Sequence, residues 1–310
     1  MHAAILTAPD RLPVYAEHPD AQASRPGSAV VDVLAAGLHH LTRAKATGSH
    51  YSSGASFPLV PGVDGVVRDE TGALRYVVLD DSRLGTFADR TVIDVQRSVL
   101  LPTGVDPVTI AAAMNPAMSS WVALRRRISM PQNARVLVIG ATGAAGRLAV
   151  QVAKLFGASH VTAVGRDLDR LSTLSGLGAD ELVPLTDLAA AANADVVLDY
   201  IWGEPVASAL IPMLTRRRDR SAPLTWIQLG SMAGETAAIP AAALRSARLE
   251  FVGSGIGSVK ARDIITELPA LADALTSGAL SVDVRAVSLS LVEDYWNAPV
   301  EERVVFLPGS

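Results

Sequence analysis

The fold is decided by one stretch, Val136-Leu137-Val138-Ile139-Gly140-Ala141-Thr142-Gly143-Ala144-Ala145-Gly146-Arg147-Leu148-Ala149-Val150. Its apolar start is typical of a buried strand that ends at Gly140, and a helix with one apolar face begins near Gly143. The small residues from 140 to 146 let a ligand approach the backbone closely and let the helix pack on the strand. Free N–H groups at the start of that helix would bind a pyrophosphate. The stretch therefore predicts a dinucleotide-binding loop, the alternative being a tight turn selected for packing alone.

The sequence around this loop alternates short apolar runs with helical stretches. Helices are expected over 143–156 and 167–177. The expected strands are 136–139, 161–164, 181–183, 196–198, 224–229 and 249–252. Strands buried on both faces and joined by crossover helices predict a doubly wound parallel sheet.

The flanking segments show a different pattern. Strands are expected over 29–34, 74–79 and 91–95, separated by turn residues, so the first 120 residues are predicted to be mostly β. After Lys260 we expect one long helix over 261–277 and a closing strand over 303–307. A chain of 310 residues is long enough for about two domains.

Composition excludes several classes of protein. There is no cysteine, hence no disulfide or thiolate metal site, and a formal net charge of -4 argues against a dedicated nucleic-acid binder. The uncharged stretch 107–124 is the best membrane candidate, but Pro116 would break a spanning helix. The runs Arg125–Arg127 and Arg216–Arg218 are interpreted as solvated helix ends. The sequence predicts a soluble, cytoplasmic protein that binds neither nucleic acid nor membrane.

The residues that follow the second strand of the sheet indicate which dinucleotide is bound. An enzyme that uses NAD carries an acidic residue there, about 20 residues past the loop, for the ribose 2′-hydroxyl. This chain has Gly165-Arg166-Asp167. Arg166 offers a guanidinium group to a 2′-phosphate, and Asp167 is expected to cap the next helix. NADP(H) is therefore favoured; the alternative is that Arg166 is a surface residue and Asp167 binds the ribose of NAD(H).

The whole chain resembles the medium-chain dehydrogenase/reductase superfamily, and within it the zinc-free branch similar to quinone oxidoreductases. The motifs that carry the resemblance are the loop 140–146, Gly48-Ser49-His50-Tyr51 with Phe57-Pro58-Leu59-Val60-Pro61-Gly62, Leu100-Leu101-Pro102, Ser119-Ser120-Trp121 and Ile227-Gln228-Leu229-Gly230-Ser231. The resemblance implies a Rossmann domain over 120–260, inserted in a GroES-like β-barrel substrate domain formed by 1–119 and 261–310. It also implies a homodimer that pairs through the strand 249–252.

The same resemblance bears on metal chemistry. The positions that hold ligands in metal-dependent members carry His39, Val63 and Asn115 in this chain. Val63 cannot coordinate zinc and Asn115 is a poor ligand, so no metal is expected. The resemblance then implies an NADPH-dependent reductase that delivers hydride to an activated C=C bond, as in an enone or enoyl compound, or to a quinone. A carbonyl reductase or alcohol dehydrogenase of the same fold and a non-catalytic NADP(H)-binding protein are the alternatives.

The resemblance also suggests site residues. Three catalytic candidates are expected, namely Ser119 and His39 near the nicotinamide and Tyr51 as proton donor or carbonyl anchor. The alternative is that His39 is a packed residue and that Tyr51 only fills the mouth of the cleft. The expected NADPH-binding residues are Gly140, Thr142, Gly143, Ala144, Ala145, Gly165, Arg166, Tyr200, Gly230, Ser231, Gly253 and Ser254.

Overall fold

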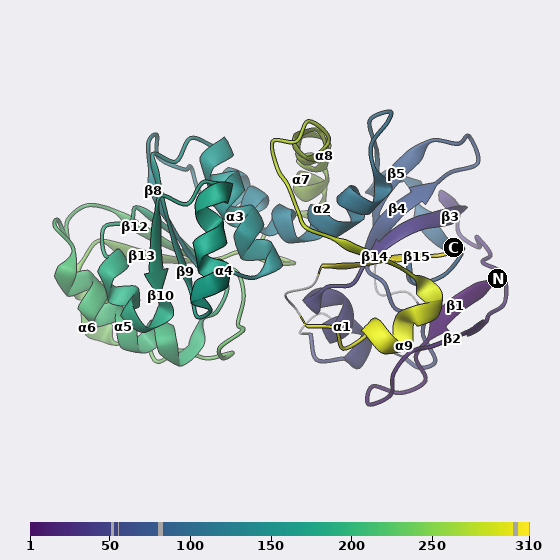
Figure 1. The fold of residues 1–310 in the computed structure, drawn as a ribbon, viewed down its shortest axis with the longest axis horizontal. Helices are drawn as coiled ribbons and strands as arrows, with labels where there is room; N and C mark the ends of the chain where they lie inside the picture. Colours follow the sequence, from purple (N-terminus) through teal and green to yellow (C-terminus); the bar gives the residue numbers. More distant parts are fainter. Residues whose placement is uncertain (51–52, 55, 80–82, 300–302, 310) are drawn as a thin grey trace. The chain divides into compact units, whose positions relative to one another are not determined.

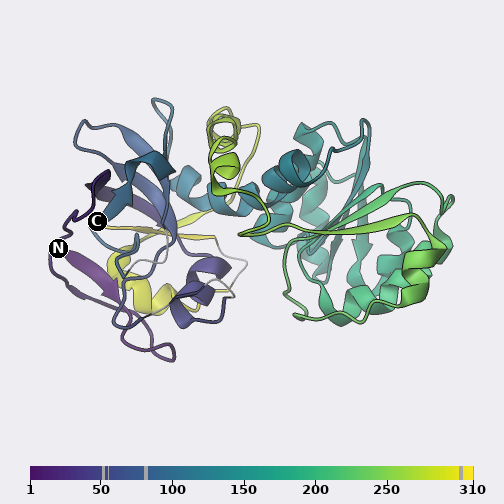
Figure 2. The same ribbon diagram turned by 180° about the vertical axis from the view of Figure 1, so that it is seen from behind.

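The computed structural model describes residues 1–50, 53–54, 56–79, 83–299 and 303–309. The chain forms two compact units, of which unit 1 comprises Met1–Asn115 and Ile265–Ser310 and unit 2 comprises Pro116–Ile264. Unit 1 appears in purple, blue and yellow and contains both termini, and unit 2 appears in teal and green (Figures 1 and 2). Compared with the expected boundaries at 119/120 and 260/261, unit 2 begins four residues earlier and ends four residues later.

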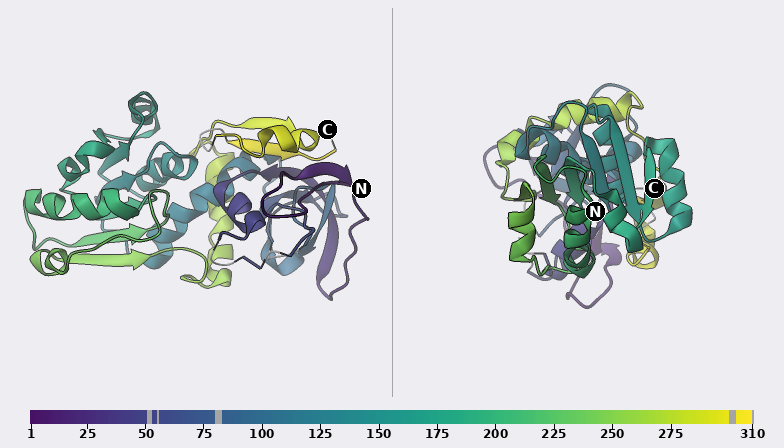
Figure 3. Two further views of the ribbon diagram at one scale, coloured as in Figure 1. Left: turned by 90° about the horizontal axis from the view of Figure 1, so that it is seen from below. Right: turned by 90° about the vertical axis from the view of Figure 1, so that its left-hand side faces the viewer.

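Unit 2 is built on a parallel sheet of six strands in the order β10-β9-β8-β11-β12-β13. Helices lie on both sides of this sheet (Figure 3). The elements are η2 (Ala123–Arg127), β8 (Arg135–Ile139), α3 (Ala144–Leu155), β9 (His160–Gly165), α4 (Leu168–Ser172), η3 (Thr173–Leu177), β10 (Glu181–Pro184), η4 (Leu185–Ala191), β11 (Val196–Asp199), α5 (Gly203–Arg216), β12 (Leu224–Gln228), α6 (Ala241–Ser246) and β13 (Leu249–Gly253). The predicted doubly wound sheet and its six strands are confirmed.

The apolar character of these strands follows from burial on both faces. Leu137 and Ile139 of β8 pack into a cluster with Leu210 and Met213 of α5, while α3 contacts β8 and β9. From β8 the chain goes to β9 and β10 on one side and then crosses to β11 on the other. The strand order therefore reverses beside β8, which is where ligands bind in open α/β sheets.

Unit 1 contains a two-stranded sheet, β1-β2, and a larger sheet in the order β14-β15-β3-β4-β5-β7, with β6 paired to β3. Its elements are β1 (His2–Ile5), β2 (Val14–Glu17), β3 (Ser28–Gly37), α1 (His40–Thr47), β4 (Asp64–Arg68), β5 (Leu74–Val78), β6 (Arg90–Asp94), η1 (Val95–Arg97), β7 (Ser98–Leu100), α8 (Leu268–Thr276), β14 (Arg285–Ser288), η5 (Leu289–Leu291), α9 (Val292–Tyr295) and β15 (Val304–Leu307). Two further helices, α2 (Pro107–Val122) and α7 (Ala261–Ile265), include the unit boundaries.

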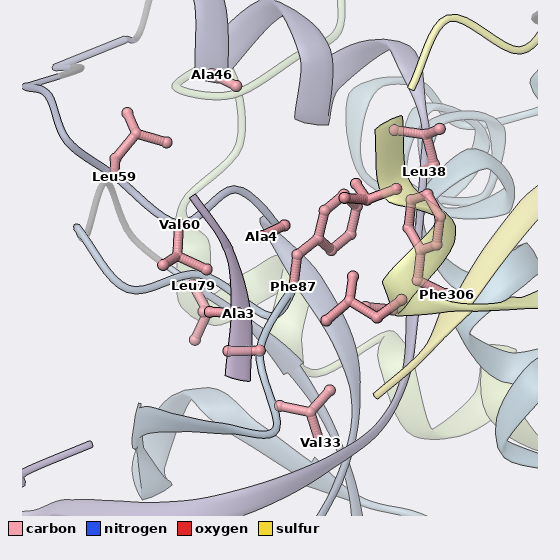
Figure 4. Close-up of a cluster of buried hydrophobic side chains, with 14 of the residues drawn as sticks. Ala3, Ala4, Val33, Leu38, Ala46, Leu59, Val60, Leu79, Phe87 and Phe306 are labelled. Carbon is pink, nitrogen blue, oxygen red and sulfur yellow. The ribbon is translucent and has the colours of Figure 1, made fainter. Parts of the chain in front are cut away.

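The core of unit 1 joins residues from the two ends of the chain. Phe87 and Phe306 are fully buried and meet edge to face, with ring centroids 5.0 Å apart. Ala4 and Leu38 lie close to them (Figure 4). Strand β15 pairs with β3 in the same unit, so the carboxyl-terminal segment completes a sheet begun near residue 28. This arrangement explains how unit 2 can be inserted without interrupting the core of unit 1.

Helix α2 continues through Pro116, where we expected a break. Proline has no N–H, so it cannot bond to the carbonyl of Ala112 one turn earlier. Arg303 supplies the missing donor, because its Nε bonds to the Ala112 carbonyl while its other nitrogens bond to the carbonyls of Ala111 and Leu38. None of the helices in the described ranges combines the length and the hydropathy that crossing a bilayer requires.

The structure overturns two other expectations. The single helix expected over 261–277 is two helices, α7 and α8, because Pro269 in the first turn of α8 has no N–H to donate to the preceding turn. Arg217 is buried rather than solvated, and its Nη1 bonds to the carbonyls of Ala192 (3.0 Å) and Ala194 (2.6 Å). The basic run at 216–218 therefore includes a structural residue.

Candidate cofactor and active site

The glycine loop, residues 140–146, connects β8 to α3 in unit 2. Gly140 has a left-handed backbone (φ 84°), and a Cβ on it would lie 2.9 Å from the side chain of Ile201. A Cβ on Gly146 would lie 2.3 Å from the carbonyl oxygen of Gly140. Both positions therefore require glycine, the first for the turn and the second for close packing of helix on strand.

The start of α3 leaves backbone donors available. The helix is capped by Gly143, which has no side chain to accept from its first turn. Among the described residues, no acceptor is found for the amides of Ala144 and Ala145. A Cβ on Gly143 would touch only the Gly140 carbonyl oxygen, at 3.7 Å, so the space in front of these amides is open. Open space, free amides and the positive helix end together form a cradle suited to a pyrophosphate.

The residues after β9 form the next part of the site. A Cβ on Gly165 would lie 2.6 Å from Cγ2 of Thr142, so Gly165 allows the end of β9 to approach the glycine loop. Arg166 is exposed. Asp167 caps α4, accepting from the amide of Arg170 at 3.1 Å, as predicted. Asp167 is therefore engaged in its own helix.

Arg170, which was not predicted as a site residue, also reaches the glycine loop. One of its guanidinium nitrogens lies 3.5 Å from the carbonyl oxygen of Thr142, so this side chain bridges α4 and the glycine loop. Arg170 stands four residues after Arg166, at the first turn of the helix that Asp167 caps. The sequence feature that could have identified Arg170 is its spacing from Asp167. Because Asp167 caps the helix, residue 170 lies in the first turn, on the side that faces the glycine loop.

Ser119 and Tyr200 are brought together from distant parts of unit 2. The hydroxyl oxygens are 3.0 Å apart, and Ser119 donates to the Pro116 carbonyl at 2.8 Å. The Tyr200 hydroxyl therefore donates to Ser119. Burial raises the pKa of Tyr200 to about 12, so this residue stays protonated at neutral pH.

Tyr200 also lies at the carboxyl ends of the central strands. A Cβ on Gly230 would lie 2.7 Å from the carbonyl oxygen of Tyr200, and one on Gly140 would lie 3.2 Å from its Cβ. The Ser254 amide bonds to the Gln228 carbonyl at the end of β12. The other predicted residues of this region, Ser231 and Gly253, follow β12 and end β13 respectively. The cofactor residues predicted from the sequence thus lie at the carboxyl ends of the strands of one sheet.

A buried carboxylate that was not predicted from the sequence organises the turn after β11. Asp199 is fully buried and accepts from the amides of Ile201 and Trp202 and from Nε1 of Trp226, at 2.9, 2.9 and 3.0 Å. Burial raises the pKa of Asp199, while these three bonds oppose the shift. Trp202 adopts φ 52° and ψ -157°, a conformation almost restricted to glycine that costs about 1–3 kcal/mol.

Known proteins are similar to this chain along its whole length. No family model matches it. It is 29% identical over 359 residues, covering 99% of this chain and 100% of the relative, to the probable NADPH-dependent quinone reductase tdiC of Emericella nidulans. Its structure is similar to that of the quinone oxidoreductase from Thermus thermophilus, with a TM-score of 0.82, 24% identity and coverage of 99% and 100%.

The resemblance to the medium-chain dehydrogenase/reductase superfamily, and within it to quinone oxidoreductases, thus extends over the whole length of the chain. A thermostable alcohol dehydrogenase from Pyrobaculum aerophilum has the same fold, with a TM-score of 0.79, 22% identity and coverage of 99% of both chains. The predicted fold class, a Rossmann unit inserted in a GroES-like unit, is confirmed.

Unit 1 holds His39 in a buried polar network, defined as His39, Asp64, Tyr76 and Arg303. Nε2 of His39 lies 2.7 Å from Asp64 Oδ1, and the Tyr76 hydroxyl donates to Oδ2 at 2.6 Å. Nδ1 of His39 accepts from the amide of Thr42, so Nε2 carries the proton and donates to Asp64. Both ring nitrogens of His39 are therefore hydrogen-bonded inside unit 1.

The charges in the buried polar network follow from burial. Burial lowers the pKa of His39, against the opposing effect of the Asp64 carboxylate, and favours the neutral ring. Burial raises the pKa of Tyr76 well above its usual value. It lowers the pKa of Arg303 to about 10, so the guanidinium remains the cation that balances Asp64 at neutral pH.

The remaining predictions for unit 1 concern Tyr51 and the absence of a metal site. Tyr51 lies outside the described residues. Val63 precedes Asp64, and in the described ranges no three side chains of His, Cys, Asp or Glu gather in a group that could hold a metal ion. Asp64, Tyr76 and Arg303 were not identified from the sequence, because only the tertiary structure joins residues so far apart in the chain.

Proposed function

We propose that this protein is an NADPH-dependent oxidoreductase that reduces a quinone or an activated C=C bond. The observation that carries the proposal is the cradle at the start of α3, where Gly146 admits no Cβ and the first amides have no acceptor among the described residues. The relative from Emericella nidulans is named as a probable NADPH-dependent quinone reductase, and the Thermus thermophilus enzyme has been crystallised with NADPH. Both names support the same cofactor and the same class of substrate.

The residues present fit this cofactor. The amides of Ala144 and Ala145 would hold the pyrophosphate, with Gly140, Thr142 and Gly143 forming the turn beside it. Arg166 and Arg170 would hold the 2′-phosphate. The residues Tyr200, Gly230, Ser231, Gly253 and Ser254 would line the nicotinamide half. NADPH, when bound, supplies the hydride.

The side chains of this protein would contribute orientation and hydrogen bonds to the oxygen that gains charge. The Tyr200 hydroxyl donates to Ser119, and the Ser119 hydroxyl donates to the Pro116 carbonyl. A hydroxyl of this pair would have to rotate out of this arrangement to donate to a developing enolate or hydroquinone oxygen. His39 acts as a positioning residue, because both its nitrogens are engaged. Tyr51 remains the proposed proton donor or carbonyl anchor. A cytoplasmic location and a homodimer paired through β13, the edge strand of the sheet, belong to the same proposal.

The first test follows NADPH absorbance with a panel of quinones and enones. We expect oxidation of NADPH, with the enone saturated at its C=C bond. An allylic alcohol as product would support the carbonyl reductase instead. Binding of NADPH without consumption across the panel would support a non-catalytic cofactor-binding protein.

The second test concerns cofactor choice. Arg170→Gln and Arg166→Gln should each weaken NADPH binding by about tenfold or more, because each removes a charge-assisted bond worth about 1.5–3 kcal/mol, and should leave NADH binding unchanged. Titration of tryptophan emission with either nucleotide measures this. Arg135→Gln is the matched control, since Arg135 starts β8 at the far end of the strand and bonds to the Asn193 carbonyl. Equal losses for NADPH and NADH would contradict the assignment.

A further inference from the structure

Asp199 places a buried carboxylate at the centre of the parallel sheet in unit 2. It is the last residue of β11, and its backbone pairs with Ile139 of β8 on one side and with Gln228 of β12 on the other. Ile139 is the last residue before the glycine loop, which begins at Gly140. Neighbouring strands of a sheet lie about 4.8 Å apart. Asp199 is therefore one strand away from the start of the glycine loop.

The hydrogen bonds of Asp199 favour the ionised form of its carboxyl group. Oδ1 accepts from the amides of Ile201 and Trp202, both at 2.9 Å, and Oδ2 accepts from Nε1 of Trp226 at 3.0 Å. All three partners are N–H donors, and each of these bonds is strongest when the acceptor is a carboxylate. The geometry around Asp199 therefore selects the negatively charged form.

The charge of this carboxylate has no cationic partner in the described part of the chain. Asp199 is fully buried, and burial raises its pKa. The three hydrogen bonds oppose this shift, but no charged side chain among the described residues contributes to it. Buried charges in proteins are normally paired. An unpaired anion at this position can therefore stabilise a positive charge that a ligand brings.

The residues next to Asp199 are among those proposed to line the nicotinamide half of the cofactor. Tyr200 follows it directly in the chain, and the main-chain carbonyl of Asp199 accepts from the amide of Gly230 at 3.1 Å. The nicotinamide ring is neutral in NADPH and carries one positive charge in NADP⁺. The two forms of the cofactor thus differ by a charge of the sign that an anion at the end of β11 attracts.

We propose that the buried Asp199 carboxylate favours NADP⁺ over NADPH in the bound cofactor and thereby promotes hydride transfer to the substrate. This inference deepens the proposed reductase function and rests on it. Coulomb attraction does not require contact, because in a buried environment it falls off slowly with distance and is little screened by salt. When the substrate takes up the hydride, which is one proton with two electrons, Asp199 stabilises the positive charge left on the ring.

The first test compares the affinities for the two forms of the cofactor by calorimetry, without a substrate. Asp199→Asn keeps the size of the side chain and removes its charge. This variant should weaken NADP⁺ binding about three- to tenfold more than NADPH binding, because only NADP⁺ carries the positive ring. Binding of 2′-phospho-ADP-ribose, which has the phosphates without the nicotinamide, should be the same in the variant and in the unmodified protein.

Two controls separate the charge of Asp199 from the shape of the turn. The amide nitrogen of an asparagine would face the Nε1 donor of Trp226, so Asp199→Asn is also made in a Trp226→Phe background, where this conflict is absent. The ratio of the two affinities should change equally in both backgrounds. Asp187→Asn removes an exposed carboxylate that pairs with Arg216 and should leave the ratio unchanged. Melting temperatures show whether each variant folds.

The affinities also show which conclusion fails. Equal losses of NADP⁺ and NADPH affinity in Asp199→Asn would show that Asp199 only shapes the turn, and would overturn the inference alone. If the unmodified protein binds neither nucleotide, the proposed function fails together with the inference. If it binds both but reduces no quinone or enone, the proposed reaction fails, and the ratio of affinities still decides whether Asp199 favours NADP⁺.

The second test measures single turnovers with saturating NADPH and 1,4-naphthoquinone. Asp199→Asn should lower the rate of NADPH oxidation by about three- to tenfold, because the ring gains its positive charge in the transition state. Asp187→Asn should oxidise NADPH at the rate of the unmodified protein. An unchanged rate in Asp199→Asn would contradict the promotion of hydride transfer.

Discussion

The glycine loop of unit 2 and the buried polar network of unit 1 differ in the groups they use and in how far apart these groups lie in the sequence. The glycine loop uses seven consecutive residues and exposes backbone amides, so its chemistry depends on what is missing, namely side chains at Gly143 and Gly146. The buried polar network joins residues 39, 64, 76 and 303, and its chemistry depends on side chains that satisfy one another. Ligand binding by backbone is thus local in sequence, whereas a buried charge needs partners from several elements.

The largest effect is expected from the buried polar network. Arg303→Met should lower the free energy of unfolding by about 3–5 kcal/mol, because it leaves Asp64 as a buried charge without its cation and leaves the Ala112 carbonyl, which Pro116 cannot serve, without a donor. Urea unfolding measures the change. Arg90→Met is the matched control, since Arg90 and Asp32 form an exposed pair, and should change stability by less than about 1 kcal/mol. Equal effects of the two variants would show that the buried polar network is not a special source of stability.

The next effect concerns the glycine loop. Gly146→Val should weaken NADPH binding by at least about a hundredfold, since a Cβ 2.3 Å from the Gly140 carbonyl must push the loop away from α3. Fluorescence titration measures the affinity and thermal melting the stability. Gly176→Ala is the control, because a Cβ there meets no atom within 4 Å. Unchanged affinity in Gly146→Val would show that the loop binds no dinucleotide.

The smallest expected effect is on the pH dependence of the free energy of unfolding, which distinguishes the buried polar network from the glycine loop. The pKa of His39 is lowered in the folded protein, so the unfolded chain binds more protons below its own pKa of about 6.5. The stability contributed by neutral His39 is complete above that pH and is lost as the pH falls towards the folded value. Between pH 7 and 5, the unmodified protein should lose up to about 2 kcal/mol more than His39→Gln, by urea unfolding at each pH.

The control for this prediction is His18→Gln, a change at a half-buried histidine that bonds to the Pro19 carbonyl and lies outside the buried polar network. This variant should follow the pH profile of the unmodified protein. A profile of His39→Gln that coincides with that of the unmodified protein would show that His39 does not couple protonation to folding.

The sequence-based predictions were correct for most features formed by neighbouring residues and failed where distant residues meet. The six strands of unit 2, the loop and the Asp167 cap were predicted correctly, because a buried strand, a helix start and a cap each depend on neighbouring residues. The long helix over 261–277 was wrong because Pro269 lies at the start of a new helix. The break at Pro116 was wrong for the opposite reason, since Arg303, 187 positions along the chain, supplies the donor that the proline lacks.

By itself, the sequence determined the parallel sheet and the glycine turn between β8 and α3, because hydrophobic periodicity and glycine spacing act over a few residues. Only the tertiary structure decided the proton position on His39, the contact of Arg170 with Thr142, the pairing of Ser119 with Tyr200 and the left-handed backbone of Trp202. Each of these depends on a group from another element. Hydrogen bonds and close contacts act over about 3 Å in space, whatever the separation along the chain.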